Sequence, residues 1–211
     1  VEIEFAVNLK KDKEPEFAII QIRPLIITQE NEQISWEEDE IEKSNVLIHS
    51  KNALGNGLID NIKDIVVVNP DEFDSSKTIQ IANEIGKIND ELKDTPYVLI
   101  GPGRWGTQDR WLGVPVVWNE ISNVKLMVET ALEDFNIKPT QGTHFFQNII
   151  SRGIGYVNVS LNPRTSKIDW EWLKKQKTKK KLKYVSHICL KKLIVIKLDG
   201  KNGQALVTKP E

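Results

Sequence analysis

A carboxylate, a carboxamide and a guanidinium lie close together near the start of the sequence, on two segments that alternate like β-strands. Glu4 lies in the first segment, Val1–Leu9, and Gln21 and Arg23 lie in the second, Glu16–Leu25. Strand side chains alternate between faces, so Gln21 and Arg23 share a face, and the polar tract between the segments predicts a hairpin. Together these groups can hold a metal ion against phosphate oxygens. The pattern also fits a half-exposed antiparallel pair with a surface ion pair.

Two short motifs in these segments resemble a known family. Ile-Glu-Phe-Ala at Ile3–Ala6 and Gln-Ile-Arg-Pro at Gln21–Pro24 resemble the last two strands of the nucleotide-binding, ATP-grasp-like domain of phosphoenolpyruvate synthase and pyruvate phosphate dikinase. The resemblance covers about an eighth of the chain. It implies that Glu4 and Gln21 help hold Mg-ATP, with both as magnesium ligands, and that Arg23 contacts the phosphates. We therefore expect the hairpin to close an ATP site whose other parts lie upstream in a longer chain.

The remaining sequence departs from this family's pattern. Neither the phosphohistidine turn nor the long barrel of the enolpyruvate-binding domain follows Gln-Ile-Arg-Pro. His144 is a weak candidate for a phosphoryl-carrying histidine, because Phe145 and Phe146 follow it where the family has small residues. A core or capping histidine at a helix start is the preferred interpretation. His49 and His187 lie in apolar strand patterns and are expected to be structural, and no two histidines have metal-ligand spacing.

A glycine-rich loop follows a predicted strand in the middle of the chain. Its start, Gly101-Pro-Gly-Arg-Trp-Gly106, matches G-x-G-x-x-G, but Gly113 and Pro115 leave no room for the helix that a dinucleotide site requires. The glycines and two arginines instead suit a phosphate or carboxylate. A tight structural loop, with its tryptophans on the core and its arginines paired with Asp109 and Glu120, fits equally well. The candidate anion-binding residues are Gly101, Gly103, Arg104, Gly106 and Arg110.

Length, charge and cysteine content restrict the classes of function. The 211 residues carry a net charge of -1, so no global field favours nucleic acid or an anionic membrane. Cys189 is the single cysteine, which excludes a disulfide framework and predicts a buried structural thiol. No apolar run reaches the length of a membrane span, and we expect a cytoplasmic protein. The basic run Lys174–Lys183 has few aromatic neighbours and predicts a solvated loop rather than a single-stranded nucleic-acid site.

The composition divides the chain into three parts. Residues 1–28 contain the hairpin, residues 29–45 are an acidic linker with Ser35 and Glu38 at capping-box spacing, and residues 46–211 are a separate domain. In that domain strand-like and helical segments predict an α/β or α+β fold with a mixed, partly antiparallel sheet and flanking helices. The expected strands are 46–49, 65–68, 97–100, 114–118, 124–128, 155–161, 186–197 and 205–208. The expected helices are 74–93, 141–151 and 168–175.

Two functional hypotheses follow from these features. The leading one is the C-terminal portion of an ATP-dependent phosphotransferase similar to phosphoenolpyruvate synthase or pyruvate phosphate dikinase, with Mg-ATP as cofactor and no activity without the upstream chain. The alternative is a non-catalytic binding or interaction domain centred on the Gly101–Gly113 loop, with a nucleotide or a small phosphorylated or carboxylate compound as ligand. An independent small enzyme that uses His144 with Arg104 or Arg110 has the least support.

Overall fold

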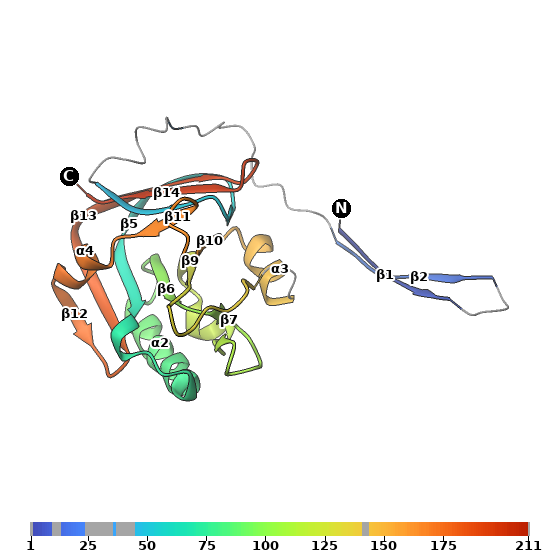
Figure 1. Cartoon of the computed structure of the whole chain (residues 1–211), viewed down its shortest axis with the longest axis horizontal. Helices are drawn as coiled ribbons and strands as arrows, with labels where there is room; N and C mark the ends of the chain where they lie inside the picture. Colours follow the sequence, from blue (N-terminus) through green and yellow to red (C-terminus); the bar gives the residue numbers. More distant parts are fainter. Residues whose placement is uncertain (1, 10–13, 24–35, 37–44, 141–143, 211) are drawn as a thin grey trace.

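The computed structural model describes residues 2–9, 14–23, 36, 45–140 and 144–210 (Figure 1). The opening segment forms the predicted antiparallel hairpin from β1 (Glu2–Asn8) and β2 (Glu16–Arg23). A bulge follows Glu4, where the pairing register shifts by one residue. Pro24 and the linker residues Ser35 and Glu38 lie outside the described residues, so the expected capping box stays a prediction.

Residues 45–210 build a ten-stranded mixed sheet that curls back on itself. Four of its strands, β5, β6, β9 and β10, run parallel to one another, and the others pair antiparallel. The strand order is β11-β3-β14-β13-β5-β6-β9-β10-β4, with β12 also paired to β13. The bounds are β3 (Val46–Ser50), β4 (Ala53–Leu54), β5 (Gly57–Val68), β6 (Tyr97–Pro102), β9 (Val124–Thr130), β10 (Gly155–Val159), β11 (Ser166–Ile168), β12 (Thr178–Lys181), β13 (Val185–Asp199) and β14 (Gln204–Thr208).

One short chain segment joins the two ends of this sheet. The strands β3 and β4 are consecutive along the chain, yet β3 pairs with β14 whereas β4 pairs with β10. The hydroxyl of Ser50, the last residue of β3, donates a hydrogen bond of 2.5 Å to the Asn158 carbonyl of β10. The sheet therefore has an enclosed inner face and an outer face.

Apolar side chains fill both faces because the strands alternate. On β5, Ile65 and Val67 join the inner core, while Val66 and Val68 join the outer core. The outer core is covered by α2 (Thr78–Leu92), whose buried residues recur at helical spacing, and by α3 (His144–Ser151) (Figure 1). Glu84 of α2 accepts hydrogen bonds from the backbone N–H groups of Tyr184 and Val185, where β13 begins, and fastens the helix to the sheet.

The fold confirms the predicted mixture of helices with a partly antiparallel sheet, and corrects it in two places. The predicted strand 114–118 is wrong: only β8 (Gly113–Val114) is extended, paired with β7 (Arg104–Trp105), and a 3-10 turn, η3 (Trp118–Ile121), follows. Pro115 lacks the N–H group that a strand ladder needs. The loop predicted after the helix 168–175 is wrong in part: the helix is present as α4 (Trp170–Lys175), but β12 occupies the following residues, which are mostly exposed as expected. No helix in the described part of the chain is both long and apolar enough to cross a membrane.

Candidate functional site

The predicted glycine loop lies at the edge where the parallel strands end. It follows β6, and the last residues of β9 and β10 lie beside it in register, with Gly101 aligned to Glu129. Ligands in open α/β sheets collect outside this carboxyl edge. The loop therefore follows a strand at a sheet edge, as the sequence predicted.

Close packing accounts for the glycines of this loop. Gly103 and Gly106 have φ angles of +70° and +65°, in the left-handed region that side chains with a Cβ rarely adopt. A Cβ on Gly106 would lie 2.2 Å from the Phe145 ring of α3, and one on Gly113 would lie 2.0 Å from the Arg104 carbonyl oxygen. The glycines thus allow the loop to fold tightly against itself and against α3.

Four consecutive backbone N–H groups at the start of the loop donate to acceptors of the protein itself. Gly103 donates to the Thr130 carbonyl at 3.1 Å, and Arg104 and Gly106 donate to the carbonyls of Leu112 and Val114 at 2.9 Å each. The Trp105 N–H donates to Glu129 Oε1 at 3.1 Å. A phosphate cradle uses such amides as donors to the ligand. These four N–H groups are therefore not free to cradle an anion, and the anion-binding role of the loop stays a prediction.

Glu129, in β9, is the centre of a buried hydrogen-bond cluster behind the loop. Its Oε2 accepts hydrogen bonds from the Tyr156 hydroxyl at 2.7 Å and the Thr140 N–H at 2.9 Å. Its Oε1 accepts from the Trp105 N–H and from the Thr140 hydroxyl. The carboxylate therefore connects three parts of the chain: the glycine loop through Trp105, the segment that precedes α3 through Thr140, and strand β10 through Tyr156. Sequence reasoning missed this residue, although a lone acid inside the apolar run 124–130 is the signal that could have found it.

Burial dominates the electrostatics of this cluster. It raises the pKa of Glu129, and it outweighs the hydrogen bonds from Thr140, Tyr156 and Trp105, which lower that pKa. Burial also raises the pKa of Tyr156 well above its usual range, with a further contribution from the charge of Glu129. Both groups are almost fully enclosed, so the cluster holds the loop in place and offers no exposed acid or base.

The two arginines of the loop have different surroundings. Arg104 donates from Nε to the Lys138 carbonyl oxygen at 2.8 Å. The Arg110 guanidinium lies 5.0 Å above the half-exposed Trp111 ring. Trp105 is fully buried, as the structural interpretation expected, and its indole N–H donates to the Val128 carbonyl. The expected acidic partners have other contacts: Asp109 accepts the Trp111 N–H and Glu120 accepts the Val117 N–H.

The structure brings the start of α3 against the glycine loop. Phe145 packs on Gly106 and stacks on Trp118, with the two ring centroids 4.5 Å apart. The Arg152 guanidinium lies 4.8 Å from the centroid of the Trp118 ring. His144 is the first residue of this helix. Its side chain lies outside the described part of the chain, so its assignment as a phosphoryl carrier or as a capping residue stays a prediction.

The residues of the family resemblance lie opposite each other on the hairpin. Glu4 aligns with Gln21, and Glu2 aligns with Arg23. Side chains of directly opposed residues share a face, so the Glu4 and Gln21 side chains are neighbours. The other face is apolar and exposed: Phe5 and Phe17, with ring centroids 5.2 Å apart, are 57% and 61% exposed.

Two further titratable groups form a buried pair that the sequence pattern did not reveal. His187 Nε2 lies 2.7 Å from Asp64 Oδ1, on neighbouring strands β13 and β5. Burial opposes ionisation of Asp64, but hydrogen bonds from His187 and Cys189 and the charge of His187 lower its pKa overall.

Cys189 is half-buried rather than buried, and burial raises its thiol pKa. Burial and the charge of Lys51 lower the pKa of His49, and both histidines lie in the core, as expected.

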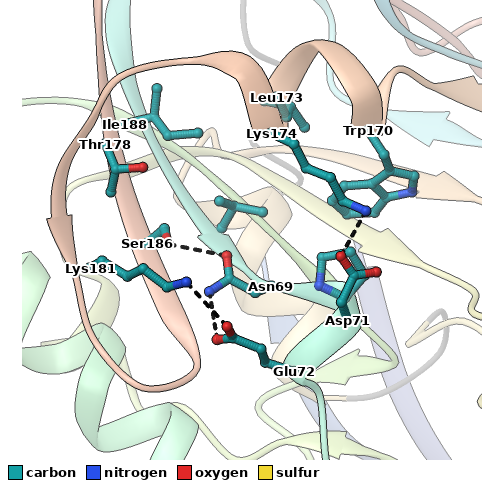
Figure 2. Close-up of a pocket in the computed structure, with 12 residues that line it drawn as sticks. Asn69, Asp71, Glu72, Trp170, Leu173, Lys174, Thr178, Lys181, Ser186 and Ile188 are labelled. Atoms are coloured by element: carbon teal, nitrogen blue, oxygen red, sulfur yellow. Dashed lines mark hydrogen bonds and ion pairs between the residues drawn. The ribbon is translucent and has the colours of Figure 1, made fainter.

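A cavity of about 180 Å³ lies at the end of β5, between α4, β12, β13 and the turn η1 (Pro70–Glu72) (Figure 2). Two ion pairs border it, Lys174 to Asp71 at 2.7 Å and Lys181 to Glu72 at 3.1 Å. Asn69 donates to Glu72 and accepts from the Ser186 hydroxyl, which holds the strand end in place. The apolar side chains of the lining are Val67, Pro70, Trp170, Leu173 and Ile188.

Comparisons with known proteins leave the family open. No family model, curated protein or solved structure matches this chain significantly. Among the residues that the structure describes, no three His, Cys, Asp or Glu side chains are grouped closely enough to hold a metal ion. The features that bear on function are therefore the hairpin and the carboxyl edge of the sheet.

Proposed function

We propose that the chain is part of an ATP-dependent phosphotransferase and that its hairpin contributes to the Mg-ATP site. The observation that carries the proposal is the alignment of Glu4 with Gln21 across the two strands. The resemblance to phosphoenolpyruvate synthase and pyruvate phosphate dikinase requires these residues to act together. A shift of one residue would turn one of them to the opposite face.

The exposed apolar face of the hairpin is consistent with this role. Isolated two-stranded hairpins have marginal stability in water, and an exposed apolar face of this kind needs a partner. We infer that this face packs against the upstream part of the same protein. The polar face with Glu4 and Gln21 then borders the nucleotide.

The donors on the polar face suit magnesium. A carboxylate and a carboxamide supply hard oxygen ligands, and Mg²⁺ completes its coordination with phosphate oxygens and water. Arg23 neutralises negative charge on the phosphates. Phosphoryl transfer depends mostly on positioning and on charge stabilisation, so these residues support a reaction whose remaining machinery lies elsewhere.

The test is magnesium-dependent ATP turnover by the complete protein that contains this chain. Arg23→Ala and Glu4→Gln are each expected to reduce turnover by about 100-fold or more, the size of effect seen when one charge-stabilising contact is removed. Glu14→Gln, at an exposed glutamate of the same hairpin, is the matched control and is expected to keep full turnover. Unchanged turnover in Arg23→Ala contradicts the assignment of the site.

Binding of an anion at the Gly101–Gly113 loop is a second, weaker proposal. Its support is the position of the loop at the carboxyl edge and the exposed stack of Arg110 on Trp111. Thermal stabilisation of the chain by phosphoenolpyruvate or a nucleotide, lost in Arg110→Ala but kept in Arg164→Ala, would support it. If neither phosphoenolpyruvate nor a nucleotide stabilises the chain, this second proposal is excluded.

A further inference from the structure

We propose that the cavity at the end of β5 binds a small zwitterion with an apolar part, such as a free α-amino acid. The cavity lies at the carboxyl end of the first parallel strand and opens beside α4 (Figure 2). Its volume of about 180 Å³ has room for one small organic molecule. The proposal is independent of the ATP site assigned to the hairpin.

The charges around the cavity balance in sign and number. Lys174 and Lys181 face Asp71 and Glu72 across its rim, one pair on the α4 side and one on the β12 side. Exposed ion pairs of this kind contribute little to stability, so a ligand can replace one partner in each at small cost. The carboxylate of the ligand then pairs with one of the two lysines in place of its acid. The ammonium group of the ligand pairs with the acid of the other ion pair in place of its lysine.

The floor of the cavity selects for an apolar portion. Val67, Leu173 and Ile188 belong to the inner core, and the Trp170 ring lies against that core beside Lys174 (Figure 2). Binding sites for small molecules combine such apolar surface with a few fixed polar groups. Here Asn69 is held by the Ser186 hydroxyl at 3.1 Å and by Glu72 at 3.2 Å. A phosphate or nucleotide would place several negative charges near two carboxylates, which disfavours that class of ligand.

Titration calorimetry of the 211-residue chain with apolar amino acids tests the ligand class. L-valine, L-leucine, L-methionine and L-phenylalanine are the probes, and at least one is expected to bind saturably. For the amino acid that binds, the N-acetyl derivative lacks the ammonium group and the amide derivative lacks the carboxylate. Each is expected to bind about tenfold more weakly or worse, because it loses a charge-assisted contact. Equal binding of either derivative, tighter binding of phosphoenolpyruvate, or no binding of any amino acid overturns the proposal.

Variants of the two rim lysines test the location. Lys174→Gln and Lys181→Gln remove exposed charges and are expected to leave the melting temperature nearly unchanged. Each is expected to weaken amino-acid binding about tenfold or more. Lys175→Gln, on the same helix but outside the cavity lining, is the matched control and keeps wild-type affinity. If all three variants bind like the wild type, the amino acid binds elsewhere and the cavity is not the site.

Discussion

Replacing Glu129 with glutamine is expected to destabilise the protein, although the two side chains have nearly the same shape. The Trp105 N–H donates to one carboxylate oxygen and the Thr140 N–H donates to the other. A glutamine has a single acceptor oxygen, so its NH₂ group faces one of these backbone N–H groups in either orientation. Hydroxyl groups can rotate to accept a hydrogen bond, but a backbone N–H cannot. One buried donor is therefore left without a partner.

The expected loss follows from that single donor. A buried donor without a partner costs about 1–3 kcal/mol. In a domain of this size the loss corresponds to a fall in melting temperature of about 2–12 °C. Tyr156→Phe removes one neutral donor to the same carboxylate and is expected to cost less, about 0.5–1.5 kcal/mol. Glu133→Gln, at an exposed residue, is the control and is expected to melt like the wild type. Urea unfolding and calorimetry measure all three variants.

The pH dependence of this effect has a definite sign. Burial raises the pKa of Glu129 above its usual value near 4.5. Between that value and the raised pKa, the folded protein binds a proton that the unfolded chain has released, so wild-type stability falls as pH rises. The glutamine variant lacks this titration. Its destabilisation is therefore expected to be larger at pH 5 than at pH 8. A variant as stable as the wild type at both pH values would refute the role of Glu129 as an anchor.

Four other tests concern the packing, the buried ion pair and the thiol. Gly106→Ala is expected to cost about 2–5 kcal/mol in thermal unfolding, because φ is +65° and the new Cβ meets the Phe145 ring; a loss below about 0.5 kcal/mol would contradict this reasoning. His187→Ala is expected to cost about 3–5 kcal/mol in urea unfolding, because Asp64 remains buried without its partner, and His187→Asn, which keeps a donor, should lose less. The lowered pKa of Asp64 adds stability above pH 3.8 that is lost as pH falls through the folded pKa, and acid unfolding of the wild type against Asp64→Asn checks the sign. The Cys189 thiol, whose pKa is raised by burial, is expected to react with iodoacetamide at pH 7 more slowly than free cysteine.

The sequence predicts those parts of the fold that depend on local patterns. Strands such as 97–100 and 124–128 are continuous apolar runs, and the helix 74–93 has clear helical spacing, so both kinds of element were found near their observed bounds. The strand β12 was missed because four polar residues, Thr178–Lys181, have no strand pattern. Its backbone pairing with β13 places it in the sheet.

The candidate site was predicted less completely, because much of it depends on contacts between residues far apart in the sequence. The loop 101–113 and its position after a strand could be read from the sequence, and so could the alternation that puts Gln21 and Arg23 on one face. Glu129 contacts residues up to 27 positions away along the chain, and the pair of His187 with Asp64 spans 123 positions. Contacts between segments so far apart depend on the register and curl of the sheet, which no local periodicity records.

The pairing of β3 with β14 has a consequence for biosynthesis. The first strand of the domain, β3, lies between β14 and β11, and Val46 aligns with Thr208. A ribosome must therefore release almost the whole domain before β3 can find its main partner. Until then the inner core stays open along one edge, and its apolar residues are exposed to other chains. Pairing over such long sequence separations slows folding and raises the risk of aggregation. The domain is thus one that completes its folding only after translation of its last strand.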